Sequence, residues 1–390
     1  MRILIVNAAG GEEWRGGVER GIALSASLLA ERDVEVSLLQ ALPASGDGRV
    51  PTTVLAHRAR GRLARRVQNR TLDFRSSPTR DLESAVARSG ADVVHTHNLP
   101  GVTTAIWDVA RRQGLPVVHS LHDYYLLCPR ASLMDRRGQF CGNHPSCRLR
   151  TTRLARWADA VSVVVGVSDA VLDAHRPLFA NARLEVLRNP MVAFDPDSLR
   201  PPSRSPMTVG YIGGLTREKG IVELLAAAEL LAGDTRFRFR IGGHGLLAGL
   251  VTDQAARLPQ LTYVGAVRPA GKQAFFEGCD VGIIPSVWAE PGGPTHVLAE
   301  WLTAGRPVLV SLRGGLAEVG RESGAALPVK PTPDAIVAAL RELAEPARWD
   351  DVLAARRRWD PQAEIDRWIG WQIELYDSLA GSGGGRPPGQ

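Results

Sequence analysis

The chain has 390 residues, a formal net charge of +6 at pH 7, 44% hydrophobic and 23% charged residues. Because one hydrophobic core stops growing at roughly 250–300 residues, we expect two domains. The composition excludes wholesale disorder, and four cysteines are too few for a disulfide scaffold. The first residues resemble a strand rather than a signal peptide, and no apolar run reaches the roughly 18–20 residues that span a bilayer. We therefore expect a cytoplasmic protein, in contact with a membrane at most peripherally at its inner face.

The first half alternates apolar strand-like runs with helical patterns. The runs lie at 3–6, 34–40, 91–97, 115–123, 160–168 and 183–190. Strands that alternate with helices predict a parallel sheet covered on both faces. We expect residues 1–190 to form a Rossmann-like domain.

The second half repeats this organisation after a break. Residues 191–206 are rich in proline and serine, lack periodicity and predict a linker. The alternation restarts and predicts a second doubly wound domain over 207–361, with the strand ends of both domains facing a common cleft. An amphipathic pattern predicts a long helix over 362–380, and 381–390 have the composition of a disordered tail.

A glycine-rich turn in the sequence GYIGGLTREKG carries Arg217 and Lys219 between an apolar strand and a helix. Backbone amides and a helix N-terminus favour an anion at such a turn, and Lys219 adds a positive charge. The glycines alone are equally compatible with a tight strand–helix connection.

A second motif lies about 70 residues later. Glu290 stands in a Gly/Pro loop, and a helix is expected to open near Thr295. The amides of Thr295, His296 and Val297 would point at an anion, and Glu300 could accept hydrogen bonds from a ribose diol. Carboxylates on either side of phosphate-binding amides suit a nucleotide-sugar. The alternative is two solvated glutamates around a turn.

Several motifs in order resemble the family-4 glycosyltransferases of GT-B fold. They are Gly16-Gly17-Val18-Glu19, His122 in HSLHD, GGLTREKG at 213–220 and AGRPV at 304–308. The resemblance covers the chain to about residue 380. It implies an α/β protein with two Rossmann-like parallel-sheet domains, and a C-terminal helix that packs back on the first domain. It also implies a retaining enzyme with no obligatory metal.

The resemblance further implies roles for individual residues. Lys219 should bind the donor diphosphate, and Glu300 the ribose. Glu290, with the amides of Gly292 and Gly293, should bind the donor sugar. His122 should reach the outer hydroxyls of that sugar, and Gly16 and Gly17 should lie against the diphosphate. The implied reaction moves a hexose from a UDP- or GDP-linked donor to an acceptor hydroxyl without a resident cofactor. The acceptor could be a polysaccharide, a glycolipid or a natural product.

The sequence departs from the family pattern at two places. Gly214 stands where the family has an arginine, and Arg217 of the same loop is the candidate substitute. The acidic motif is E-x9-E, two residues longer than the family's E-x7-E. Either Glu290 still reaches the sugar through a bulged loop, or sugar recognition is altered.

Two other functions share this architecture. A nucleotide-sugar 2-epimerase would bind the same donor, and a non-catalytic partner subunit would explain the departures at Gly214 and Glu290. The glycine loop with Glu19 and the E-x9-E motif favour transfer.

The arginine-rich segment 57–75 is either a basic amphipathic helix on an anionic membrane or a solvated surface helix. A nucleic-acid partner is not expected, because aromatic interleaving and recognition motifs are absent.

Metal binding is not expected to be part of the function. Cys128, Cys141 and Cys147 could form a zinc site with His144, but their irregular spacing favours ordinary thiols. His95 and His97, two residues apart on one face of a strand, favour a cleft-lining or structural role.

Overall fold

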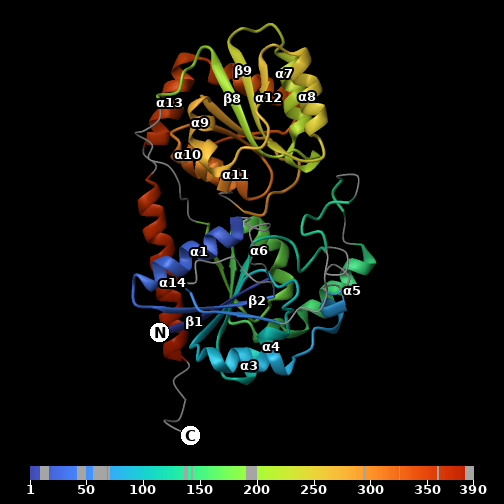
Figure 1. Ribbon diagram of the computed structural model, residues 1–390, viewed down its shortest axis with the longest axis vertical. Coiled ribbons are helices and arrows are strands. Elements are labelled where there is room, and N and C mark those ends of the chain that lie inside the picture. Colours follow the sequence, from blue (N-terminus) through green and yellow to red (C-terminus); the bar gives the residue numbers. More distant parts are fainter. Residues whose placement is uncertain are drawn as a thin grey trace. The chain divides into compact units, whose positions relative to one another are not determined.

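The computed structural model of the protein describes residues 1–8, 17–41, 50–55, 68, 71–135, 139–141, 144–189, 200–292, 296–324, 326–357 and 360–382. The chain divides into two compact units, and each is an α/β fold around a parallel sheet, which confirms the predicted fold class (Figure 1). The first unit contains Met1–Asp135, Phe140–Arg188 and Asp366–Gln390. The second contains Arg136–Gln139 and Asn189–Ile365.

The first unit has a seven-stranded sheet in the order β3-β2-β1-β4-β5-β6-β7. Its strands are β1 (Arg2–Asn7), β2 (Glu35–Gln40), β3 (Thr52–Val54), β4 (Val93–Thr96), β5 (Val117–Leu121), β6 (Val163–Gly166) and β7 (Arg183–Val186). Its helices include α1 (Gly17–Ala30), α3 (Arg80–Ser89), α4 (Ala105–Arg112), α5 (Pro145–Leu154), α6 (Asp169–His175) and, at the C-terminus, α14 (Pro361–Ser382). The unit also contains the short 3-10 segments η2 (Ala155–Ala160) and η3 (Arg176–Leu178).

Strand residues of the first unit alternate between two hydrophobic layers. Leu4 and Val6 belong to the core that contains α3, α4 and α6, whereas Ile3 and Ile5 belong to the core with α1 and α14. This follows from the two-residue period of a strand, because successive side chains point to opposite faces. Both faces of the central strands are covered, so β4, β5 and β6 are buried along their whole length.

Helix α14 completes the first unit from the far end of the sequence. It lies beside α1 (Figure 1), and its residues Trp368, Ile369, Leu375 and Tyr376 are buried in the same core as α1. The hydroxyl of Ser25 in α1 also donates to Gln372 Oε1 at 2.9 Å. The helix continues to Ser382, two residues beyond the range that the sequence pattern predicts.

The second unit has a six-stranded sheet in the order β10-β9-β8-β11-β12-β13. Its strands are β8 (Met207–Gly214), β9 (Phe237–His244), β10 (Leu261–Tyr263), β11 (Val281–Ile284), β12 (Val308–Ser311) and β13 (Ala326–Val329). Its helices are α7 (Ile221–Leu230), α8 (Ala248–Arg257), α9 (Lys272–Glu277), α10 (His296–Thr303), α11 (Gly315–Ser323), α12 (Pro333–Leu343) and α13 (Pro346–Arg357), with 3-10 turns η5 (Arg217–Lys219) and η6 (Pro269–Gly271).

Two glycines let α10 pack directly on this sheet. A Cβ built at Gly210 of β8 would lie 2.4 Å from the ring of Trp301, and one at Gly282 of β11 would also lie 2.4 Å from it. Trp301 is fully buried and meets Phe276 of α9 edge to face at 4.5 Å between ring centroids. The sequence thereby fixes α10, which carries Glu300, at contact distance from the middle of the sheet.

Both sheets have a topological switch point, where the strand order reverses. It lies between β1 and β4 in the first unit and between β8 and β11 in the second. Doubly wound folds bind ligands at the carboxyl ends of the strands beside this point. None of the helices that the structure describes is long and apolar enough to cross a membrane.

Candidate active site

The turn after β8 is fastened to the loop after β11. Gly220 has φ +73°, and a Cβ there would lie 1.8 Å from the carbonyl oxygen of Pro285. Only glycine fits this position, because it tolerates positive φ and has no side chain to clash. The amide of Val287 donates to Glu218 O at 3.0 Å. The two loops that flank the switch point are therefore held together by their backbones.

Lys219 and Glu290 meet across this junction. Lys219 Nζ donates to Glu290 Oε1 at 2.6 Å, and the hydroxyl of Ser286 donates to the same oxygen at 2.7 Å. The Glu290 side chain is 6% exposed and that of Lys219 is 35% exposed. Lys219 Nζ also lies 5.1 Å from the ring centroid of Trp288. The pair therefore presents an ammonium group to solvent above a buried carboxylate.

Tyr211 lies beneath the same turn. Its hydroxyl donates to the carbonyl oxygen of Gly214 at 2.7 Å. Burial and the carboxylates of Glu290 and Glu218 raise the pKa of Tyr211 well above its usual range. The phenol therefore stays protonated and keeps the strand end in place as a hydrogen-bond donor.

The loop that carries Glu290 is also held in place by Gly314. Glu290 and Gly314 form a parallel bridge, and Gly315 N donates to Glu290 O at 2.9 Å. Gly314 has φ +64°, and a Cβ there would lie 2.2 Å from Glu290 O. The E-x9-E motif is two residues longer than the family's motif, and Glu290 nevertheless remains in contact with Lys219.

Glu300 lies in α10 and pairs with a residue that the motifs do not include. Lys272 Nζ donates to Glu300 Oε1; the lysine side chain is partly buried, at 18% exposed, and the glutamate side chain is 8% exposed. Gly292 is buried before α10, and His296 and Val297 are the first two residues of the helix. Gly293, Thr295 and the His296 side chain lie outside the described residues.

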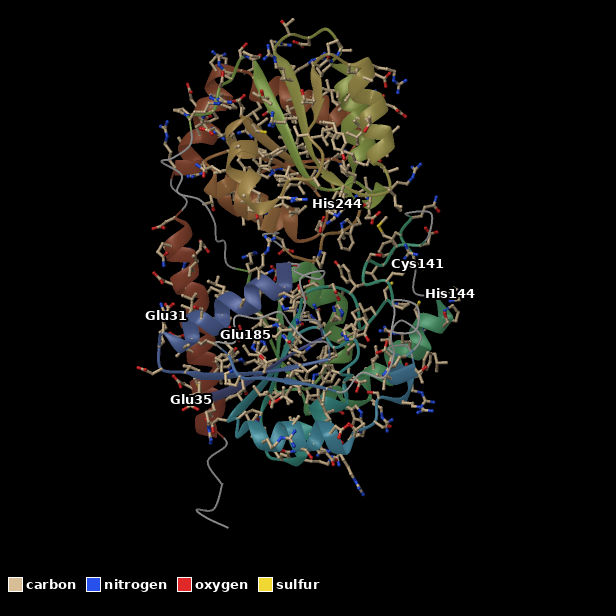
Figure 2. The ribbon with its side chains drawn as sticks, viewed as in Figure 1. Glu31, Glu35, Cys141, His144, Glu185 and His244 are labelled. Carbon is tan, nitrogen blue, oxygen red and sulfur yellow. The ribbon has the colours of Figure 1, made fainter. Side chains whose placement is uncertain are left out.

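The position of Gly214 is open. A Cβ at Gly214 would meet no atom within 4 Å, and Arg217 is exposed on η5. On the neighbouring strand, His244 is the partner of Gly214 in the parallel register and is also exposed (Figure 2). Arg217 on the turn after β8, and His244 in register with Gly214, are therefore both exposed close to the end of β8 in the chain or in the sheet.

The first unit gathers histidines at the ends of β4 and β5. His97 Nδ1 and His122 Nε2 share a hydrogen bond at 2.8 Å, and their rings stack at 5.1 Å. His95 stacks on His97 at 4.3 Å, bonds Tyr376 OH through Nδ1 at 2.6 Å and Ser120 Oγ through Nε2 at 2.8 Å. His95 is thus tied to α14, and His97 positions His122.

His95 and His97 are held in the neutral form. Burial and the nearby His122 lower the pKa of His95 to about 3. Burial also lowers the pKa of His97 well below its usual range, reinforced by His95, His122 and His119. Neutral rings can donate through one nitrogen and accept through the other, as the shared hydrogen bonds require.

A small pocket beside them is lined by His97, Asn98, His122, Asp123 and Tyr125, among others. Asp123 Oδ1 accepts from Tyr125 N at 2.7 Å. Burial raises the pKa of Asp123 to about 6, partly offset by that amide and by Arg150. Arg150 in turn forms a buried salt bridge at 2.8 Å with an aspartate, Asp73.

Other sequence predictions fall partly outside the described residues. Gly16 is outside them, and Gly17 begins α1. Of the segment 57–75, only 68 and 71–75 are described. Cys141 lies just before His144, which caps α5, and the four cysteines are free thiols (Figure 2). Within the described ranges, no group of three or more His, Cys, Asp or Glu side chains could hold a metal ion.

Comparison with known families divides the chain in the same way. The model of Glycosyltransferase Family 4 matches residues 15–191, and that of Glycosyl transferases group 1 matches residues 206–346. A 42.6 kDa protein in the cps region of Klebsiella pneumoniae is 27% identical over 247 residues, which are 62% of this chain and 63% of that protein. A glycogen synthase of Mycobacterium tuberculosis is 27% identical over 279 residues, 68% of this chain and 62% of the synthase. The chain thus matches less than two thirds of the length of these relatives.

Solved structures share the whole fold at low sequence identity. Sucrose-phosphate synthase from Thermosynechococcus elongatus has a TM-score of 0.71 at 18% identity, covering 98% of this chain and 100% of that one. Anabaena HepE in complex with UDP-glucose has a TM-score of 0.61 at 19% identity, covering 96% and 100%. These similarities establish a GT-B fold.

Proposed function

The chain belongs to the glycosyltransferases of family 4, and we propose that it moves a hexose from a nucleotide-sugar donor to an acceptor hydroxyl with retention of configuration. The observation that carries this proposal is the Lys219–Glu290 pair at the switch point of the second unit. It offers a cation for a diphosphate and a carboxylate for sugar hydroxyls at the edge where such folds bind ligands. Anabaena HepE, of the same fold, was solved with UDP and with UDP-glucose.

In this proposal the second unit binds the donor. Lys219 and the amides at the start of α10, from His296 and Val297, stabilise the negative charge that develops on the departing diphosphate. Stabilisation of such charge by preorganised donors is typically the largest catalytic effect. Arg217 lies on the same turn as Lys219 and adds a second positive charge. Gly292 and Gly293 contribute amides to the sugar beside Glu290, and Glu300 binds the ribose.

The proposal also assigns side chains to the donor sugar. Glu290 accepts hydrogen bonds from its hydroxyls, and His122 takes the role that the family resemblance implies, binding the outer hydroxyls. The hydrogen bond between His97 Nδ1 and His122 Nε2 fixes the orientation of the His122 ring and couples the tautomers of the two rings. The acceptor oxygen attacks the anomeric carbon on the face from which the diphosphate leaves, and its proton passes to the leaving phosphate oxygen. This step requires no protein nucleophile.

A 2-epimerase is the second candidate, since it would use the same donor site. A non-catalytic subunit is the third, because the family's arginine is replaced by Gly214. Incubation of the protein with donor alone separates these possibilities. A transferase releases the nucleoside diphosphate and free sugar slowly to water, an epimerase yields a new sugar isomer, and a non-catalytic subunit yields neither.

The experiment that tests the proposed function is a donor screen by thermal unfolding. UDP-, GDP-, ADP- and dTDP-linked hexoses are each added to the full chain. A ligand at 100 times its dissociation constant stabilises the folded protein by about 2.7 kcal/mol. We expect at least one nucleotide-sugar to raise the melting temperature. When that donor is α-linked, the sugar that the protein releases from it should initially be the α-anomer. Absence of a shift with every donor, or release of the β-anomer, contradicts the proposal.

A further inference from the structure

Helix α5 has an outer side that the packing of the first unit does not use. Its inner side is fixed in the unit, because Arg150 and Leu154 are buried. On the outer side, Arg148, Leu149 and Arg153 are exposed. The helix lies at the periphery of the first unit (Figure 1). These three side chains are therefore available to a partner.

The described end of the arginine-rich segment 57–75 is fastened to this helix. Arg150 donates to Asp73 Oδ2 through Nε at 3.1 Å and through Nη2 at 2.8 Å. Residues 71–75 are helical, and Phe74 and Arg75, which follow Asp73, are exposed. The buried ion pair thus holds two arginine-rich parts of the sequence together.

The exposed arginines carry charge that carboxylates do not offset. Over residues 136–158 the sequence has six arginines and no Asp or Glu. The exposed arginines of α4 in the same unit pair with carboxylates. Within the part of the chain that the structure describes, Arg75, Arg148 and Arg153 form no such ion pair. Positive charges gathered in this way favour an anionic partner.

Large apolar side chains accompany these arginines. Phe140, shortly before the start of α5, is 75% exposed, Leu149 is 56% exposed and Phe74 is 46% exposed. A single exposed apolar side chain is common. Phenylalanine and leucine among arginines are instead typical of segments that lie in the surface of a membrane. We call the following residues together the α5 face: Phe74, Arg75, Phe140, Arg148, Leu149 and Arg153.

This combination of side chains fits the boundary between lipid headgroups and acyl chains. A guanidinium group binds a phosphate through two parallel hydrogen bonds, and the long arginine stem lets its charge stay among the headgroups. Phenylalanine and leucine gain from leaving water for the acyl boundary. A nucleic acid would use the arginines and stack on the phenylalanines, but it would leave Leu149 without a role. The α5 face therefore fits a lipid surface better than a nucleic acid.

We propose that the α5 face docks the first unit onto an anionic phospholipid bilayer. The arginines attract the protein to the charged headgroups, and Phe140 and Leu149 enter the boundary of the acyl layer. The sequence pattern indicates membrane contact at 57–75, and α5 is the element that the structure adds. Docking needs no nucleotide-sugar, so it holds or fails independently of the proposed function.

The test is co-sedimentation of the full chain with phosphatidylcholine vesicles, with and without phosphatidylglycerol. The wild type should bind the anionic vesicles at least about 10-fold more tightly than the neutral ones, and added salt should weaken this binding. Arg148→Gln combined with Arg153→Gln should weaken it about 10- to 25-fold, since each arginine at an anionic surface contributes about fivefold. Leu149→Gln and Phe140→Gln should each weaken it about threefold or more, because less apolar surface leaves water.

Matched control variants lie in the second unit. Leu230→Gln removes a leucine of α7 that is 54% exposed, close to the exposure of Leu149. Arg236→Gln combined with Arg238→Gln removes the same charge as the arginine variant, from exposed positions at the start of β9. Both controls should bind anionic vesicles as the wild type does. Thermal unfolding of each variant checks that the fold is kept.

Three results would overturn the proposal. The first is that the wild type binds no vesicles, or binds neutral and anionic vesicles equally. The second is that the controls lose as much binding as the variants of the α5 face. The third is that Leu149→Gln and Phe140→Gln bind anionic vesicles as tightly as the wild type. In that case, competition by a DNA oligonucleotide would assign the arginines to a nucleic acid instead.

Discussion

Lys219 and Glu290, which are 71 residues apart in the sequence, form a 2.6 Å ion pair that joins the loops on either side of the β8–β11 switch point. The carboxylate also accepts from Ser286 and is almost fully buried, whereas the ammonium group is one third exposed. The pair therefore holds the cation in place before any ligand arrives, which is the kind of preorganisation that electrostatic catalysis requires.

Replacement of Lys219 by methionine should lower turnover by about 100-fold or more, because one stabilising charge on the leaving group is lost. The measurement is the rate of nucleoside diphosphate release from a saturating donor. Arg236→Met is the control, since Arg236 lies at the amino end of β9, exposed and paired with Asp234. Turnover within threefold of the wild type in Lys219→Met would remove Lys219 from the mechanism.

Glu290→Gln should act on the sugar rather than on the nucleotide. The amide keeps the shape of the side chain but loses the charge that hydroxyl groups bind. We expect kcat/KM for the nucleotide-sugar to fall by about 10-fold or more, as for the loss of a hydrogen bond to a charged group. Calorimetry should give a dissociation constant for the nucleoside diphosphate that is unchanged or lower. Weaker binding of the diphosphate by the same factor would instead assign Glu290 a structural role.

His95 should make the protein sensitive to acid. Its pKa falls from 6.5 to about 3 on folding. The stability that it contributes is present above pH 6.5 and is lost as the pH falls toward 3, because the unfolded chain takes up a proton that the folded chain does not. Urea unfolding of His95→Gln should therefore show a shallower loss of stability between pH 6.5 and 4.5, by about 1.4 kcal/mol per pH unit. Parallel curves for variant and wild type would contradict the buried neutral state.

Asp123 should have the opposite dependence. Its pKa rises from 3.8 to about 6 on folding, chiefly through burial. The folded protein therefore keeps a proton that the unfolded chain loses, and stability falls as the pH rises from 3.8 to 6. Asp123→Asn removes this cost, so its melting temperature relative to the wild type should increase from pH 4.5 to pH 7 and then stay level. A constant difference across this range would show that the carboxyl is not buried as described.

The alternation of strand and helix patterns in the sequence predicts both sheets. This works because the spacing of apolar and polar residues within a short segment is enough to indicate a strand or a helix. The short edge strands β3 and β13 lack a clear local pattern and were not predicted. The resemblance also points to Lys219, Glu290 and Glu300, and the structure brings the first two into contact. The partners Ser286 and Lys272 could not be identified, since a side-chain pairing across two loops depends on packing. The unfavourable position of Lys272 at a helix start was the available signal.

In the first unit, too, side-chain partners that are distant in the sequence could not be predicted. The spacing of His95 and His97 predicts two side chains on one face, and their rings indeed stack at 4.3 Å. The hydrogen bond between His95 and Tyr376 joins residues 281 positions apart, and no local pattern contains it. The sequence therefore predicts which residues are candidates for the site, whereas the structure is needed to identify the side chains that they contact.

The most direct test of the central claim is calorimetry of a nucleoside diphosphate and its free nucleoside with the wild type and with Lys219→Met. UDP with uridine and GDP with guanosine are the probes. The account predicts that the wild type binds one diphosphate at least about 10-fold more tightly than its nucleoside, and that Lys219→Met loses most of this difference while nucleoside binding is unchanged. Equal affinity of the wild type and the variant for the diphosphate would contradict the account.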